Sequence, residues 1–215
     1  MPDFTLEEEC AKEYGGDVCG LDEVGRAPLA GPVVAACVFI PPGKRDLKIW
    51  RQVDDSKLLK AQTRRDMMDE IKAHCLWGIA ECCPREIEQM NIVQASLEAM
   101  RRAYQMMGQV CSLALIDGNQ KPSFPCSVLT VVKGDQKSVS IAAASIIAKV
   151  YRDGLMARLA QDHPHYGWER NVGYPTPEHL KAIDAHGLTD HHRKTFAPVR
   201  NFLEIGTVQR QLKFV

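Results

Sequence analysis

The sequence lacks the features that mark membrane-spanning, secreted and disulfide-rich proteins. No apolar run approaches the ~20 residues that a membrane helix needs. Glu7, Glu8 and Glu9 stand where a secretory signal would carry basic residues and an apolar stretch. None of the eight cysteines belongs to a C-x-x-C pair. We therefore expect a cytoplasmic protein without a membrane partner, whose reduced cysteines act as small core residues.

Net charge is also absent, because the 215 residues include 27 basic and 27 acidic side chains. A content of 45% hydrophobic and 25% charged residues is typical of a globular domain and excludes a disordered tail or a fibrous repeat. The charges are unevenly placed: residues 1–23 contain eight acids and one lysine, and residues 121–158 contain six bases and two acids. The basic segment permits an anionic partner, although overall neutrality argues against strong non-specific DNA binding.

Apolar patterning predicts strands and helices that alternate along most of the chain. β-rich runs predict strands over residues 18–24, 32–40, 76–83, 110–116 and 127–132. Helical spacing predicts helices over residues 62–75, 93–107 and 140–159, with Asn91 as the N-cap of the second. We expect an α/β domain with a mixed central sheet flanked by helices over residues 1–160, followed by a small helical extension over residues 161–215.

Acidic residues stand where three predicted strands end: Asp22 with Glu23, Asp117, and Asp135. Such side chains reach the sheet edge, where α/β folds collect active-site groups. Carboxylate oxygens that converge there would suit Mg²⁺ or Mn²⁺. Taken singly, Asp117-Gly118 and Gly134-Asp135 are equally typical of ordinary turns. The pattern as a whole favours a metal site.

The segment GLDEVGRAPLAGPV at residues 20–33 resembles the opening motif of the type 2 ribonucleases H, the bacterial ribonuclease HII family. Further matches follow in the expected order up to residue 199: DSKL (55–58), NI (91–92) with AS (95–96), LIDG (115–118), KGD (133–135), AASIIAK (143–149), GYPT (173–176) and HRKTFAPV (192–199). The chain is identified as a member of this family, and the resemblance implies an RNase H-like fold.

The resemblance also implies a divalent-metal endonuclease that cuts the RNA strand of RNA/DNA hybrids. Such an enzyme incises duplex DNA 5′ of a single embedded ribonucleotide and leaves a 3′-hydroxyl and a 5′-phosphate. The family's four metal-binding acids fall on Asp22, Glu23, Asp117 and Asp135, which are expected to hold two Mn²⁺ or Mg²⁺ ions. Four carboxylates without cations would repel one another and the phosphate, so we expect an absolute need for metal.

Substrate choice is expected to depend on other residues. In the family, a Gly-Arg-Gly turn contacts the ribose 2′-hydroxyl and a tyrosine stacks on the next sugar; the matching positions are Gly25, Arg26, Ala27 and Tyr174. The 2′-hydroxyl is the group that distinguishes RNA from DNA. Phosphate contacts are expected from Lys57, Ser145, Lys149, Arg193 and Lys194. As alternatives, Arg26 would hold a backbone phosphate, and Tyr174 and Ser145 would only pack.

Two further signals concern the histidines and the chain end. His163, His165, His191 and His192 have no cysteine nearby at ligand spacing, so we predict no zinc site. The residues Gln211, Leu212 and Phe214 resemble the short peptides by which bacterial replication enzymes bind the sliding clamp, although Leu212 and Phe214 are equally explained by local packing. We expect a monomer.

Two alternative functions remain open. Ala27 replaces the second glycine of the recognition turn, which would suit a protein that binds RNA/DNA hybrids without cutting them. The presence of all four acids argues against that alternative. A related nuclease or integrase acting on DNA is disfavoured by Tyr174 and by the Gly25-Arg26 turn.

The Ala27→Gly variant is expected to cut an isolated ribonucleotide faster, or with better discrimination, than the unmutated protein. The reason is that a Cβ at residue 27 would crowd the 2′-hydroxyl or strain the turn. Steady-state kinetics on a duplex with one ribonucleotide measure the effect. Equal kinetics for the two proteins would refute the expectation.

Overall fold

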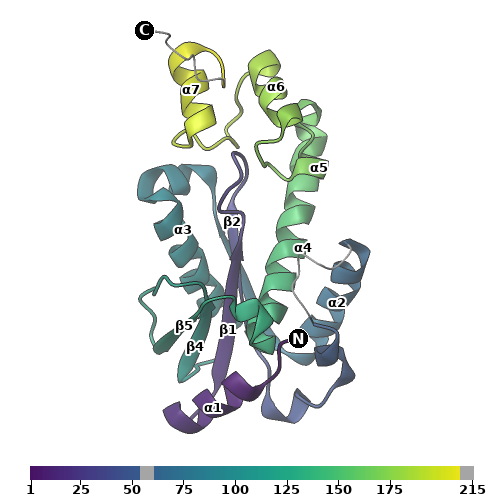
Figure 1. Cartoon of the computed structure of the whole chain (residues 1–215), viewed down its shortest axis with the longest axis vertical. Coiled ribbons are helices and arrows are strands. Elements are labelled where there is room, and N and C mark those ends of the chain that lie inside the picture. The colour runs from purple at the N-terminus through teal and green to yellow at the C-terminus, as the bar shows by residue number, and fades with distance from the viewer. Residues whose placement is uncertain (54–60, 209–215) are drawn as a thin grey trace. The chain divides into compact units, whose positions relative to one another are not determined.

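The structure is a computed structural model that describes residues 1–53 and 61–208 (Figure 1). Its strands are β1 (Val18–Val24), β2 (Val33–Phe39), β3 (Leu76–Cys82), β4 (Leu113–Asp117) and β5 (Ser127–Val131). Its α-helices are α1 (Thr5–Tyr14), α2 (Ala61–His74), α3 (Pro84–Met107), α4 (Val139–Asp162), α5 (Trp168–Asn171), α6 (Pro177–His186) and α7 (Ala197–Ile205). Short 3₁₀ turns are η1 (Pro42–Lys44), η2 (Lys48–Arg51), η3 (Gly134–Gln136) and η4 (Pro164–Tyr166).

The strands form one mixed sheet in the order β3-β2-β1-β4-β5. β1 and β2 are antiparallel, whereas β1 and β4, and β4 and β5, are parallel. The predicted mixed sheet and the hairpin-like first pair are therefore confirmed. Every residue of β2 is buried, as expected for a strand that is covered on both faces.

The described chain packs as two compact units. The first consists of Met1–Val24, Val34–Glu81 and Ser96–Tyr151, and the second of Gly25–Val33, Cys82–Ala95 and the chain from Arg152 onward. The predicted helical character beyond residue 161 is confirmed by α5, α6 and α7. The predicted domain boundary near residue 160 stays a prediction. No helix within the described ranges combines the length and apolar content needed to cross a membrane.

The first unit holds helices on both faces of the sheet (Figure 1). On one face, Val34, Ala36 and Val38 pack with Ile146 and Ile147 of α4. On the other face, the Cys37 Sγ atom donates to Met107 Sδ of α3 at 3.5 Å. Alternate residues of β2 therefore face different helices, as the period of a strand requires.

The second unit has its own apolar core around Trp168, which is fully buried with Met156, Ile183 and Val199. The indole N–H of Trp168 donates to His179 Nε2 at 3.1 Å, so a histidine satisfies the polar atom of the core tryptophan.

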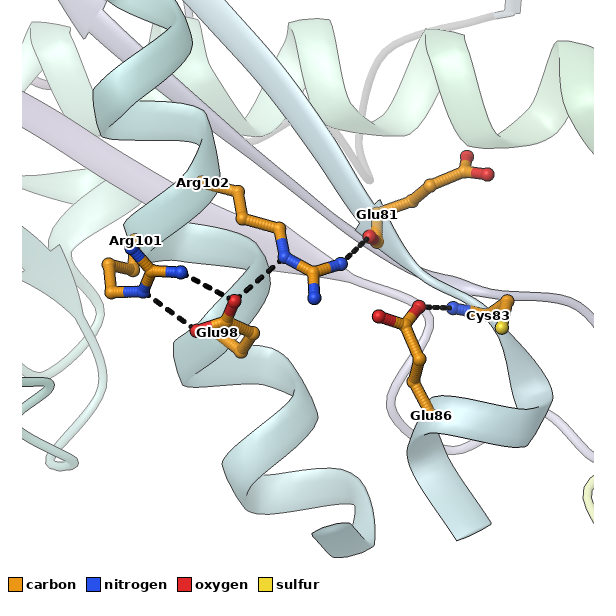
Figure 2. A network of polar contacts seen from close by, with 6 residues as sticks. All are labelled: Glu81, Cys83, Glu86, Glu98, Arg101 and Arg102. Atoms are coloured by element: carbon orange, nitrogen blue, oxygen red, sulfur yellow. Dashed lines mark hydrogen bonds and ion pairs between the residues drawn. The ribbon is translucent and has the colours of Figure 1, made fainter. Parts of the chain in front are cut away.

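Helix α3 is fixed by polar contacts at two places, which Figure 2 shows. In the first unit, Glu98 binds both Arg101 and Arg102, and hydrogen bonds from these arginines lower the pKa of Glu98 to about 2. In the second unit, Glu86 Oε2 accepts from the backbone N–H of Cys83 at 2.8 Å, just before Pro84 begins the helix. This contact is one half of a capping box.

The predicted N-cap Asn91 is confirmed within α3. Its Oδ1 atom accepts from the N–H groups of Val93 and Gln94 at 3.0 and 3.1 Å. Asn91 has φ 65° and ψ 165°, so two helical stretches meet there at a kink. Sequence periodicity found only the stretch after Asn91, and α1 was not predicted.

The buried carboxylate of Glu7 joins α1 to the first turn of α4. Glu7 Oε1 accepts from Ser138 Oγ at 2.8 Å and from the Ser140 N–H at 2.9 Å. Ser138 Oγ in turn accepts from the Ile141 N–H at 3.2 Å, which is an N-cap bond. A negative group is favourable at a helix N-terminus. Glu7 therefore fixes where α4 begins, because it binds the N-cap residue Ser138, three residues beyond Asp135.

The Glu7→Ala variant is expected to lose about 1–3 kcal/mol of unfolding free energy, because Ser138 and Ser140 would lose a buried charged acceptor. Glu8→Ala is the matched control, since Glu8 is exposed on the same helix, and should change by less than about 0.5 kcal/mol. Urea unfolding of both variants gives the comparison. Equal losses would show that Glu7 has no special role.

Candidate active site

The parallel pairing of β1 and β4 brings Asp22 and Asp117 to the same edge of the sheet. The register pairs Gly20 with Leu115 and Leu21 with Ile116, so the next position on each strand is an aspartate. Parallel strands end on one side of a sheet, where α/β folds place their sites. This part of the predicted site follows directly from strand order and register.

Asp22 is a buried carboxylate whose pKa is strongly perturbed. It is 8% exposed, and its pKa lies well above the ordinary value. Burial is the main cause, followed by the negative charges of Glu23 and Asp117. Hydrogen bonds from the Glu23 N–H, at 2.7 Å, and from the Ser145 side chain act in the opposite direction. Asp22, Glu23 and Asp117 therefore share one electrostatic environment.

Asp117 is linked to the segment that carries Asp135. Asp117 Oδ1 accepts from the N–H of Gly134 at 2.7 Å, and Asp135 follows at 4% exposure. A Cβ on Gly134 would lie 2.6 Å from Ile141 Cδ1 and 3.4 Å from Asp117 Oδ1. Glycine at 134 thus allows this close approach without a shift of the Ile141 side chain.

The acids offer the oxygen donors that Mg²⁺ and Mn²⁺ prefer, and a buried carboxylate with a raised pKa gains from a neighbouring cation. Within residues 1–53 and 61–208, no three histidine, cysteine, aspartate or glutamate side chains form a group that would hold a metal ion as they stand. Carboxylates of like charge repel one another, so a cation would have to draw these groups together. Coordination by all four acids stays a prediction.

Ser145 lies on α4 and is 5% exposed. Its side chain donates a hydrogen bond to the Asp22 carboxylate. The backbone at the start of α4 also approaches β1 closely, since a Cβ on Gly20 would lie 2.3 Å from the Ser140 carbonyl carbon. Ser145 thus positions Asp22, and its predicted contact with substrate stays a prediction.

The predicted recognition turn, Gly25–Ala27, belongs to the second unit. Gly25 has φ 93°, and a Cβ there would lie 2.2 Å from Arg152 Nε, so glycine is required. The prediction of backbone strain at Ala27 is wrong, because Ala27 is not among the residues with positive φ. The Ala27 side chain is exposed, which leaves crowding of the substrate as the remaining reason for a slower reaction.

The other predicted contacts have different outcomes. The Tyr174 side chain is 41% exposed, which argues against the alternative that it only packs. Arg193 as a phosphate contact is wrong, because it is fully buried and its guanidinium donates to backbone carbonyls. Lys57 and the clamp-like residues Gln211, Leu212 and Phe214 lie outside the described residues.

Comparisons with known proteins show the family of this chain. A sequence model described as Ribonuclease HII matches residues 19–199. The ribonuclease HII of Paramagnetospirillum magneticum is 50% identical over 203 residues, which cover 94% of this chain and 99% of the relative. That of Rhodospirillum rubrum is 51% identical over 205 residues, with 94% and 92% covered. The chain belongs to the ribonuclease HII family.

Solved structures share the fold of this chain. Ribonuclease H2 from Pyrococcus horikoshii matches with a TM-score of 0.71 at 24% identity, over 87% of this chain and 97% of that one. Bst-RNase HIII in complex with Mn²⁺ matches with a TM-score of 0.70 at 19% identity, over 90% and 71%. The predicted RNase H-like fold is confirmed. As a ribonuclease HII, the protein is a divalent-metal-dependent endonuclease that acts on the RNA strand of RNA/DNA hybrids.

The Asp22→Asn variant is expected to stabilise metal-free ribonuclease HII at pH 7 by about 1–2 kcal/mol, or roughly 3–6 °C in Tm, and to remove activity. A carboxyl group whose pKa rises on folding binds more protons in the folded state. The pKa of an aspartate in the unfolded chain is about 3.9. As the pH rises above this value, ionisation of Asp22 therefore lowers the free energy of unfolding.

Thermal unfolding in EDTA at pH 7 and pH 4 measures this effect, and the gain should shrink at pH 4. Asp69→Asn, an exposed position on α2, is the control and should change little at either pH. A loss of stability in Asp22→Asn at pH 7 would contradict the raised pKa.

Proposed function

We propose that this protein incises duplex DNA on the 5′ side of a single ribonucleotide as well as cutting longer RNA/DNA hybrids. The observation that carries the proposal is the shared electrostatic environment of Asp22, Glu23 and Asp117, together with the link from Asp117 to the Asp135 segment. Hydrolysis of a phosphodiester brings an anionic substrate to these acids, so cations are needed to offset the repulsion.

Asp22, Glu23, Asp117 and Asp135 are the residues that would hold two divalent cations, Mn²⁺ or Mg²⁺. Bound there, the pair would supply activation of the attacking water, neutralisation of the phosphate charge and stabilisation of the departing 3′-oxygen. Asp22 is placed to contribute most, because burial withholds water from its carboxylate. Ser145 and the Glu23 N–H orient that carboxylate. The products would be a 3′-hydroxyl and a 5′-phosphate.

Ribonucleotide recognition is proposed for the Gly25–Ala27 turn and Tyr174. The backbone of the turn would contact the 2′-hydroxyl, which DNA lacks. The exposed Tyr174 ring is available to stack on the neighbouring sugar. Arg26 is also exposed and would add a phosphate contact.

A sliding clamp is a second proposed partner. One structural neighbour is a PCNA:RNase HII complex from Archaeoglobus fulgidus, with a TM-score of 0.66 at 24% identity over 84% of this chain and 95% of that one. The Gln211, Leu212 and Phe214 pattern supports a similar role for the end of this chain. We propose that the nuclease itself acts as a monomer.

The test uses end-labelled duplexes that are identical except for one ribonucleotide. With Mg²⁺ or Mn²⁺, the protein should nick only the ribonucleotide duplex, 5′ of the ribonucleotide, and EDTA should abolish the nick. Asp117→Asn should lower the rate by at least about a hundredfold, as expected for loss of a ligand to a catalytic metal.

Two other outcomes would contradict the proposal. Binding of the ribonucleotide duplex without a nick would favour a hybrid-binding protein. Cleavage of the all-DNA duplex would favour a DNA-acting relative of the same fold.

A further inference from the structure

Two fully buried arginines of the second unit bind the backbone that contains the recognition turn. Arg193 donates through Nη2, Nη1 and Nε to the carbonyl oxygens of Gly25, Arg26 and Gly31, at 2.6, 3.0 and 2.9 Å. Arg152 donates through Nη2, Nε and Nη1 to those of Ala30, Pro32 and Val172, at 3.1, 2.9 and 3.0 Å. Five of the six carbonyls lie between residues 25 and 32.

This arrangement places two positive charges in a buried environment. Burial lowers the pKa of Arg193 to about 9, with a further contribution from the charge of Arg152, and burial lowers the pKa of Arg152 to about 10. Every acceptor in the six hydrogen bonds is a backbone carbonyl rather than a carboxylate. Burial of a charge is costly, so leucine or methionine would fill the same space more cheaply. The specific property that a guanidinium adds is a rigid fork of donors.

The fork of Arg193 fixes the orientation of two successive peptide groups. In a trans peptide the C=O and the N–H point in opposite directions, and the structure has no cis peptide among the described residues. Because the Gly25 and Arg26 carbonyls both point at Arg193, the N–H groups of Arg26 and Ala27 point away from it. Both of these residues are exposed. Successive N–H groups on one side of a turn are suited to bind an oxygen or an anion.

Two contacts support the placement of this fork. The Phe196 ring lies against the guanidinium of Arg193, with 5.1 Å from Cζ to the ring centroid. The Arg193 N–H also donates to the Leu29 carbonyl at 2.8 Å, so its backbone is bound to the same loop. Arg193 is therefore held at both its backbone and its side chain.

We infer that Arg193 is a positioning residue for ribonucleotide recognition, which aims the amide N–H groups of Arg26 and Ala27 at the 2′-hydroxyl oxygen of the substrate. This inference rests on the proposed function of the Gly25–Ala27 turn. Arg193 itself does not touch the substrate. Arg152 holds the neighbouring part of the loop, but its carbonyls belong to other peptide groups.

The test compares Arg193→Lys with Arg152→Lys, a matched control of equal burial and equal number of carbonyl acceptors. Affinity is measured by fluorescence anisotropy for two duplexes that differ by a single 2′-hydroxyl, with Ca²⁺ in place of the catalytic ion. Arg193→Lys should reduce the preference for the ribonucleotide duplex by about tenfold, the equivalent of one good hydrogen bond. Arg152→Lys should leave that preference within about twofold, even where it lowers stability.

A preference that survives Arg193→Lys, or falls equally in both variants, would overturn the role of Arg193. An unmutated protein that binds both duplexes equally would instead contradict the proposed function.

Amide hydrogen exchange on the unmutated protein gives an answer that does not depend on the folding of a variant. The ribonucleotide duplex should slow exchange of the Ala27 amide by at least about tenfold relative to the all-DNA duplex. Equal exchange with the two duplexes, where the ribonucleotide duplex binds more tightly, would overturn the inference.

Discussion

Electrostatic repulsion between Asp22, Glu23 and Asp117 is the constraint on which the nuclease site depends. β1 and β4 bring two of these acids to one edge of the sheet, and burial of Asp22 withholds the water that would screen its charge. The surrounding structure resists the repulsion through the Glu23 amide, Ser145 and the Gly134 amide. A divalent cation would offset the same repulsion, which gives a physical reason for a metal-dependent enzyme in this family.

Much of the fold could be predicted from the sequence, because it is set by short-range patterns. The β-rich runs at residues 18–24 and 32–40 indicated the β1–β2 pair, and the spacing after Asn91 indicated the second part of α3 with its cap. The start of α3 was missed although Pro84 and Glu86 form an N-terminal signature there, because its apolar periodicity is weak. Helix α1 was missed because a run of acids concealed Glu7, whose partners lie more than 130 residues away.

Some residues of the candidate site could also be predicted from the sequence, and others could not. The positions of Asp22 and Asp117 at strand ends were readable from the sequence, whereas the roles of Ser145 and Arg193 were not. Both had been assigned to phosphate binding, because a polar or basic residue in a matching motif suggests surface contact. Arg193 is fully buried, which contradicts its assignment to phosphate binding. Ser145 is also buried, and its side chain contacts Asp22. Sequence shows which residues carry charge or polarity, and only packing shows whether they face substrate or protein.

We propose that the acids at the ends of β1 and β4 hold a pair of divalent cations. Titration with Mn²⁺, followed by the loss of the free-ion EPR signal, tests it without any nucleic acid. We expect two bound ions for the unmutated protein and fewer for Asp22→Asn and Asp117→Asn, with Asp69→Asn unchanged. Equal Mn²⁺ binding by all four proteins would contradict it.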